Sequence, residues 1–308
     1  MSRRKLAWFA VALLGVAGLI GYAARIPALP EQRPIPSPNG YDDFVVAASM
    51  LLGERQAPVG KETPEQLAAY VATNRLALER LRFGLTRSSS APVYSSANVQ
   101  TQLDTLSGMK ALARLVAGEA ESARQAQDWD RLVIASTQGM DFGLRLAQRG
   151  VLIDQLMATS AEAMARVPLE KALAEIPAAP ARKAVLALLK LEPTRESFQS
   201  VLLNEELYVR RNSPLTMRIA WHLFLRRRIQ ATFDRAKAKH VSNVIASRTL
   251  SLQLAARAYT LERGQAPTSP QALIPEYLTA VPTHPVSGEP LSQLTPLAPI
   301  AGTKAPPE

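Results

Sequence analysis

Cysteine is absent from the 308 residues, and only three histidines are present. The chain therefore has no disulfide, no catalytic thiol and no cysteine-ligated zinc or iron–sulfur site. The spacing of His222, His240 and His284 matches no metal-binding pattern, so we expect no metal and no cofactor. The sequence also lacks a glycine-rich phosphate loop and a G-x-S-x-G nucleophile motif. These absences exclude many classes of enzyme and no class of binding protein.

Aromatic residues are sparse at 6%, although apolar residues together make up 47% of the chain. A chain of this length and apolar content can bury a sizeable core. Few aromatics combined with many Ala and Leu residues favour helix over strand. No stretch of useful length alternates with the period of a strand. The sequence therefore predicts an all-α fold.

One long apolar run, residues 6–24, follows the basic segment Ser2-Arg3-Arg4-Lys5. As a helix it spans roughly the 30 Å hydrocarbon core of a bilayer. Since basic residues are concentrated before the run, residues 1–5 are expected in the cytoplasm and the rest outside it. This predicts a single-pass inner-membrane protein with a periplasmic or otherwise extracytoplasmic body. The alternative is a cleaved secretory signal, which also exports the body.

The 23 prolines divide the remaining chain into three parts. Five of them fall within residues 25–40, which we interpret as a stiff, extended spacer. Many more follow Gln265, so residues 265–308 are expected to form a mostly irregular tail. The intervening residues 41–264 are predicted to form a helical domain, either an antiparallel bundle or an irregular array of helical hairpins.

Local signals delimit the helices of this domain. Thr63-Pro64-Glu65-Gln66 has the pattern of a capping box, and Gly264 is typical of a helix end. Pro168 is expected to end the helix before it. The predicted helices are residues 44–52, 64–86, 98–126, 131–148, 151–167, 170–176, 181–192, 195–211, 213–239 and 241–263.

Most of the net charge of +10 lies between Arg210 and His240, where Asp234 is the only acidic residue. Apolar residues are interleaved with the basic ones, as in a cationic amphipathic helix. Such a helix binds an anionic membrane surface or an acidic protein partner. The alternative is a core-packed helix whose exposed face is basic. Because the domain is expected to be exported, we expect no nucleic-acid partner.

Two groups of residues are weak candidates for catalysis. Ser107 and Lys110 match the S-x-x-K pattern of penicillin-binding hydrolases, but the accompanying Lys-Thr-Gly element is missing and Ser96-Ala97-Asn98 lies upstream. Asp154 and Glu162 share one helix face, where paired carboxylates perform acid–base chemistry. The alternative is a solvated helix edge with Glu162 and Arg166 as an i,i+4 pair. We assign no catalytic, cofactor or metal residue from either pattern.

The C-terminal sequence carries a recognisable pattern. Tyr259-Thr-Leu-Glu-Arg-Gly-Gln-Ala-Pro267 is followed by Leu273…Tyr277-Leu278 and by Pro282-Thr-His-Pro-Val-Ser-Gly-Glu-Pro290. These roughly 40 residues resemble the segment after the long helix of type II secretion pseudopilins. His284 stands where that family has aspartate, and the prepilin peptidase signature is absent. The whole layout, with its Asn39-Gly-Tyr-Asp-Asp43 entry, also resembles exported helical proteins of planctomycete-like bacteria.

These patterns favour a membrane-anchored protein that acts by binding, as a scaffold or other component of the cell envelope, and not as an enzyme. Two alternatives stay open. One is an exported hydrolase with a cleft in the helical domain. The other is an assembly factor related to secretion pseudopili.

Overall fold

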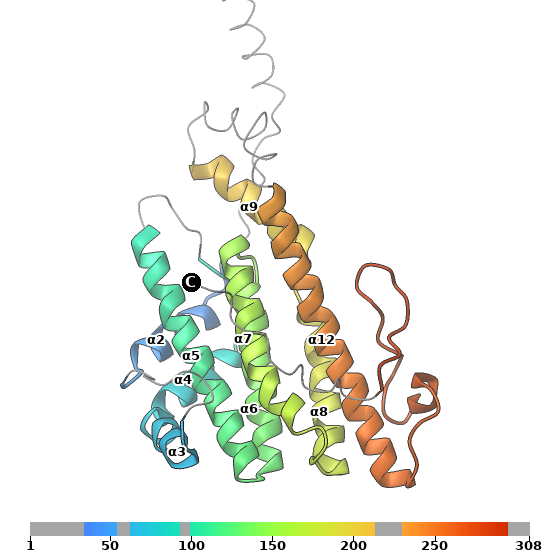
Figure 1. The fold of residues 1–308 in the computed structure, drawn as a ribbon. Helices are drawn as coiled ribbons and strands as arrows, with labels where there is room; N and C mark the ends of the chain where they lie inside the picture. The colour runs from blue at the N-terminus through green and yellow to red at the C-terminus, as the bar shows by residue number, and fades with distance from the viewer. Residues whose placement is uncertain (1–33, 54–61, 93–98, 213–229, 295–308) are drawn as a thin grey trace, which may run out of the picture.

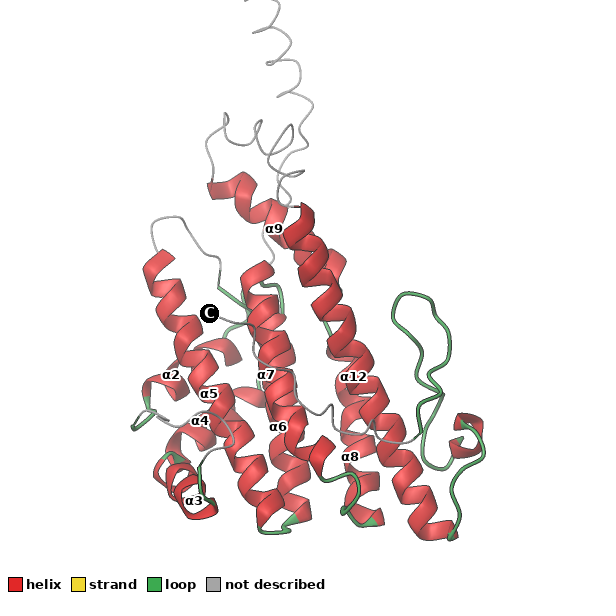
Figure 2. Cartoon of the chain, viewed as in Figure 1, coloured by secondary structure: helices red, strands yellow, loops and turns green. Residues whose placement is uncertain are grey.

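The structure is a computed structural model that describes residues 34–53, 62–92, 99–212 and 230–294. Regular structure in these residues is helical, apart from one bridge between Thr283 and Pro290 (Figure 2). The predicted all-α fold is confirmed. The predicted anchor at residues 6–24 lies outside the described residues, as does most of the spacer. None of the helices described is both long and apolar enough to cross a bilayer.

Three antiparallel helices, α5, α6 and α7, form the centre of the bundle (Figure 1). Helices α2, α3 and α4 pack on one side of them, and α8 and α12 on the other. The bounds are α2 Gly40–Ser49, α3 Pro64–Thr73, α4 Arg75–Leu85, α5 Val99–Gln125, α6 Trp129–Ala147, α7 Leu152–Lys171, α8 Ala178–Leu191, η2 Glu192–Thr194, α9 Phe198–Asn212, α12 Gln230–Arg263 and η4 Pro270–Leu273.

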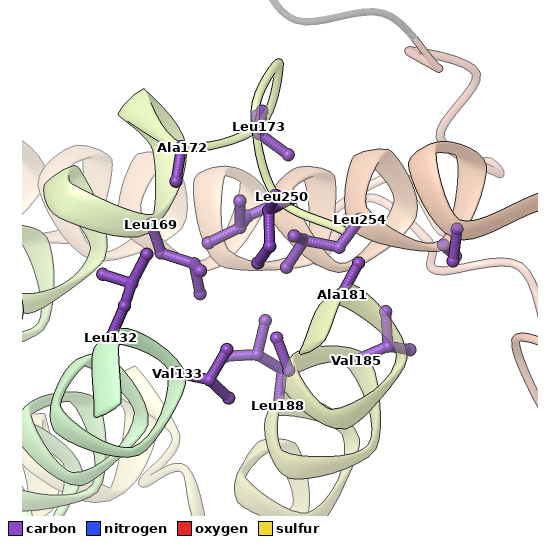
Figure 3. Packing of buried hydrophobic residues seen from close by; sticks show 14 of the residues in the cluster. Leu132, Val133, Leu169, Ala172, Leu173, Ala181, Val185, Leu188, Leu250 and Leu254 are labelled. Atoms are coloured by element: carbon purple, nitrogen blue, oxygen red, sulfur yellow. The ribbon is translucent and has the colours of Figure 1, made fainter. Parts of the chain in front are cut away.

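Two clusters of buried apolar side chains hold the bundle together. One lies between α2, α4, α5, α6 and α7 and includes Phe44 and Phe142, whose rings meet edge to face at 5.0 Å. The other joins α6 and α7 to α8, α12 and the tail, with Leu132, Leu169 and Leu254 among its members (Figure 3). Helices α6 and α7 therefore contribute to both clusters.

Close approach of α6 and α7 depends on two glycines on α6. A Cβ atom at Gly139 would lie 2.6 Å from Cβ of Ala165, and one at Gly143 would lie 2.7 Å from Cγ of Glu162. Real Cβ atoms do not approach that closely, so larger residues at these two positions would force the helices apart.

The Asn39-Gly-Tyr-Asp-Asp43 entry has a structural explanation. Asn39 Oδ1 accepts hydrogen bonds from the backbone N–H groups of Tyr41 and Ser90, and Asn39 Nδ2 donates to the Ser90 carbonyl. Gly40 lies against the end of α4, where a Cβ atom would be 2.6 Å from the Gly84 carbonyl oxygen. Asp43 is buried and is neutralised by arginines of α4 and the residues after it. The entry thus fixes α2 against α4.

Several of the predicted helix boundaries are wrong, among them the helix expected over residues 44–52, which runs from Gly40 to Ser49. The helix expected over residues 64–86 is divided at Asn74, whose side chain hydrogen-bonds to both the N–H and the carbonyl of Leu52. The helix expected to end before Pro168 continues to Lys171 and includes residue 170, expected to start a separate helix. Burial of Pro168 and Leu169 in the core offsets the backbone hydrogen bond that proline cannot make.

The boundary expected between residues 239 and 241 is also wrong. Helix α12 runs without interruption from Gln230 to Arg263, and this range contains neither glycine nor proline. His240 is buried within this helix. The basic segment of the sequence therefore ends near His240, but the helix does not end there. The preceding part of the predicted helix, residues 213–229, lies outside the described residues.

The tail folds back on the bundle as its local sequence predicts. Gly264 ends α12 with a φ of +71°, and η4 follows after a few residues. Tyr277 and Leu278 are buried in the cluster with α8 and α12. Gly288, with a φ of +75°, lies in a tight turn that pairs Thr283 with Pro290. The helix end predicted at Gly264 is therefore confirmed, whereas the pseudopilin resemblance stays a prediction.

Asn39→Ala is expected to lower the free energy of unfolding by about 2–4 kcal/mol, because three hydrogen bonds at a buried cap are lost. Urea unfolding of the two proteins measures the difference. Thr63→Ala is the matched control, since Thr63 caps an exposed helix start and its loss should cost about 1 kcal/mol. Equal costs would show that Asn39 acts only as a helix cap.

Candidate functional site

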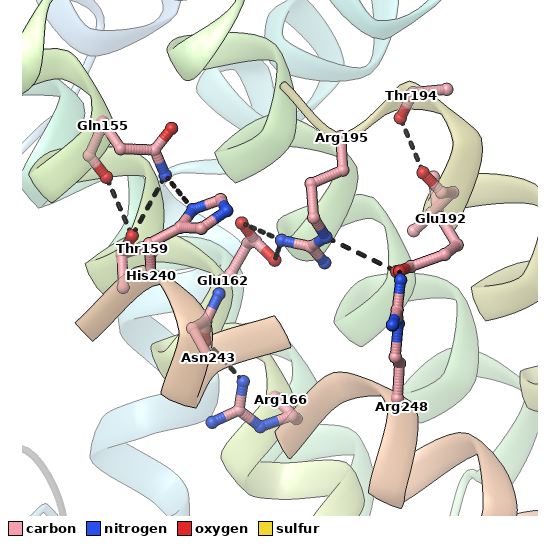
Figure 4. Close-up of polar contacts among 11 residues, drawn as sticks. Gln155, Thr159, Glu162, Arg166, Glu192, Thr194, Arg195, His240, Asn243 and Arg248 are labelled. Atoms are coloured by element: carbon pink, nitrogen blue, oxygen red, sulfur yellow. Dashed lines mark hydrogen bonds and ion pairs between the residues drawn. The ribbon is translucent and has the colours of Figure 1, made fainter. Parts of the chain in front are cut away.

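A buried carboxylate lies at the centre of the site. Glu162, on α7, has 1% of its surface exposed. Both of its oxygens accept hydrogen bonds from Nη1 of Arg195, at 2.8 and 3.1 Å (Figure 4). Burial raises the pKa of Glu162, and the positive charge of Arg195 and a hydrogen bond with Asn243 oppose the shift. The carboxylate is thus held by a partner from the connection between α8 and α9.

From Arg195 a chain of charged groups runs outward to the tail. Glu192 lies 3.4 Å from Nε of Arg195 and 2.6 Å from Nη2 of Arg248 on α12. Nη1 of Arg248 donates to the Thr283 carbonyl at 2.5 Å. Two carboxylates and two guanidinium groups therefore alternate, so their formal charges sum to zero. Through them the tail is linked to α7, η2 and α12.

This chain borders a cavity of about 330 Å³ between α6, α8, α12 and the tail. The volume is at the lower end of the range for small-molecule sites. Leucines and a methionine form much of the wall, and the polar groups are grouped together. The apolar lining residues are Met140, Leu144, Leu188, Leu189, Leu191, Ala280, Val281 and Pro282, and the polar ones are Glu192, Arg195, Ser247, Arg248, Ser251, Thr279 and Thr283.

Arg166 does not form the predicted i,i+4 pair with Glu162. Its Nε donates to Glu170 at 2.6 Å and its Nη1 donates to Oδ1 of Asn243 at 2.7 Å. Glu162 instead faces Arg195, and the side of α7 that carries it is buried, so the expected solvated helix edge is wrong. Asn243 connects α12 to this side of α7.

His240 lies one turn before Asn243 on α12. Its Nδ1 is 3.1 Å from Nε2 of Gln155, and its ring is 5.7 Å from the ring of Phe198. Burial, assisted by the positive charge of Arg195, lowers the pKa of His240 to about 4. The imidazole is therefore neutral at physiological pH, and its contacts are those of a core residue.

The other catalytic candidates do not form a site. Ser107 and Lys110 are both exposed on α5, outside the cavity. Asp154 is buried but accepts a hydrogen bond from the backbone N–H of Val151 at the start of α7. It lies two turns from Glu162, about 12 Å along the helix, which is too far for the two carboxylates to act on one proton.

His284 has a local structural role. Its Nδ1 accepts hydrogen bonds from the backbone N–H groups of Val286 and Ser287 in the tail turn. His222 lies outside the described residues. Within the described ranges, no group of His, Asp and Glu side chains is arranged to hold a metal ion.

The sequence did not point to Arg195, Glu192, Arg248 or Asn243. Arg195 and Glu192 lie at a predicted helix break, where charged residues are ordinarily solvated. The only available signal was the position of Glu162 on an apolar helix, because a carboxylate buried there requires a cationic partner from elsewhere in the chain. That signal does not identify the partner.

No family model matches the chain, and no curated protein or solved structure is significantly similar to it.

Arg195→Leu is expected to lower the free energy of unfolding by about 3–5 kcal/mol at neutral pH, because the buried Glu162 then loses its ion-pair partner. The loss should shrink in acid, where Glu162 is protonated. Denaturant unfolding at pH 7 and pH 4 measures both effects. Lys183→Ala, which breaks an exposed ion pair with Asp130, should cost less than about 1 kcal/mol. A similar cost for both variants would contradict the assigned role of Arg195.

The lowered pKa of His240 predicts that the folded protein loses stability in weak acid. Its pKa is lower in the folded protein, about 4 against 6.5, so the unfolded chain binds a proton first as the pH falls. The stabilising contribution is complete above pH 6.5 and is lost between pH 6.5 and 4, by about 2 kcal/mol after allowing for screening by water. In His240→Gln this part of the pH dependence should disappear. If the difference in the free energy of unfolding between wild type and His240→Gln stayed the same from pH 6.5 to pH 4, the lowered pKa of His240 would be refuted.

Proposed function

We propose that this is a single-pass membrane protein whose helical domain lies outside the cytoplasm and acts by binding an apolar group in the cavity beside the tail. In this proposal the chain is a binding component of the cell envelope and not an enzyme. The apolar run at residues 6–24 and the basic residues before it support the anchor and its orientation.

The composition of the cavity wall carries the binding proposal. Leu188, Leu191 and Met140 supply apolar surface, whereas the charged groups at the edge are already paired with one another. A general acid or base must be able to exchange a proton with a substrate. Glu162 is covered and held by Arg195, so it does not meet that requirement. The cavity is suited to an apolar side chain or acyl group whose polar end meets the paired charges.

The polar groups at the edge add a preference for hydrogen-bond acceptors in the ligand. Ser247 lines the cavity, and its Oγ is buried without a hydrogen-bond partner among the described residues. A carbonyl or carboxyl oxygen that reached this hydroxyl would satisfy it. Neither the hydrolase nor the pseudopilus alternative is favoured by a particular contact in the described residues.

Filling the cavity should abolish ligand binding. Ser251 is buried and lines the cavity, and its hydroxyl bonds only to its own helix, so Ser251→Leu adds apolar volume without leaving a partner unsatisfied. We expect wild-type protein purified in nanodiscs to retain an apolar small molecule, detectable by mass spectrometry after denaturation. The Ser251→Leu variant should lose it and keep its melting temperature to within a few degrees.

Ser160→Leu is the control, because Ser160 makes the same kind of intrahelical bond on the exposed side of α7. It should retain the ligand. If Ser251→Leu retained the same molecule in the same amount, or if wild type carried none when supplied with medium-chain fatty acids and their amides, the proposed binding function would be wrong.

A further inference from the structure

The first turns of α12 carry cations that have no acidic partner among the described residues. Arg235, Lys237 and Lys239 are exposed, and none of them forms an ion pair with another described residue. Arginines of the helical body behave differently, as Arg82 and Arg131 show by pairing with Glu119. Charges left without a partner in the domain are available to an external anion.

These cations lie in the first turns of α12, at the end of the bundle where α7 begins and α9 also lies (Figure 1). His240, the next residue, contacts Gln155 in the second turn of α7. The turns of α12 before His240 extend about 15 Å further in the same direction, and Figure 1 shows α12 beginning beyond the start of α7. Only Phe233 and Ala236 among these turns are buried, so their basic face is in solvent.

The described chain enters at this same end. The carbonyl of Pro34 accepts a hydrogen bond from Nη1 of Arg149, at 2.9 Å, directly before α7 begins. Pro34 is therefore placed by a contact to the residues just before α7, and the start of α12 by a contact to the first turns of α7. Residues 25–33 separate Pro34 from the apolar run, and they reach at most about 35 Å when fully extended.

We propose that this end of the bundle faces the bilayer and that Arg235, Lys237 and Lys239 bind the headgroups of anionic lipids. The inference rests on the proposed anchor at residues 6–24, since the anchor makes the entry of the chain the end nearest the membrane. The first turns of α12 extend about 15 Å beyond His240 toward the proposed bilayer, which is within the roughly 35 Å that the connecting residues allow. Attraction to an anionic surface acts over about one Debye length, about 10 Å, so docking requires this proximity.

An acidic protein would also attract these cations, but it would not require them to lie at the same end of the bundle as the entry of the chain. A bilayer does require it, because only the membrane-proximal end of a tethered domain can reach the surface. The position of Pro34 therefore favours the lipid surface over a protein partner.

The absence of cysteine makes a direct test available, because a single introduced thiol can be labelled with a fluorophore. Thr232→Cys places the label on the exposed start of α12, and Gln265→Cys places it just past the other end, about 50 Å away along the helix. The full chain is reconstituted in nanodiscs that contain an energy-transfer acceptor on the lipid headgroups. Transfer should be efficient from residue 232 and weak from residue 265, and anionic lipid should increase it only at residue 232.

Two charge variants test the role of the cations. Lys237→Ala with Lys239→Ala should lower the ratio of docked to undocked protein about twenty-fivefold, about fivefold for each lysine, in anionic nanodiscs. Lys110→Ala with Lys190→Ala removes the same charge from exposed positions elsewhere and should change nothing. High salt should reproduce the effect of the first variant.

The outcomes separate the two proposals. A chain that is not incorporated into nanodiscs would overturn the proposed anchor, and this inference with it. A chain that is incorporated but shows equal transfer from both labels, or no response to anionic lipid, would overturn this inference alone. A lysine-dependent response to polyglutamate without one to anionic lipid would instead assign the surface to an acidic protein.

Discussion

An ionised carboxylate cannot lie in an apolar core without a partner, and Glu162 imposes this requirement on the rest of the structure. No residue of its own helix meets it, so Arg195 must reach inward from the connection between α8 and α9. Glu192 and Arg248 then continue the alternation of charge to the tail. This series of charges links the connection after α8, helix α12 and the tail to one buried carboxylate, in addition to the apolar cluster that packs the same elements together, and the cavity lies where they meet.

Local signals predicted much of the fold. The capping box at Thr63 and the helix end at Gly264 depend on neighbouring residues alone, and both are confirmed. The division at Asn74 was missed because its side chain bonds to Leu52, which is 22 residues away. Helix α7 continues through Pro168 because burial outweighs one lost hydrogen bond. For the site, the sequence singled out Glu162 but not Arg195, since the pairing of two distant charges leaves no periodic trace.

The cavity and the basic end of α12 occupy different parts of one helix. Ser247 lies two turns from Lys239, and Ser251 lies one turn further. In the proposed orientation the bilayer contacts the start of α12, whereas the cavity opens along its middle, beside residues 279–283 of the tail. A ligand could then enter from the aqueous side while the domain is held at the surface. Residues 279–283 form the part of the cavity wall that is not helical, and Arg248 holds the carbonyl of Thr283 there.

Helices α6 and α7 also determine how the domain unfolds. Leu132 and Phe142 on α6 belong to different apolar clusters, yet one rigid helix carries both. Loss of packing in either cluster would leave apolar surface of α6 and α7 in water, so we expect the two clusters to unfold together. A larger residue at Gly139 or Gly143 should therefore weaken both halves of the bundle at once.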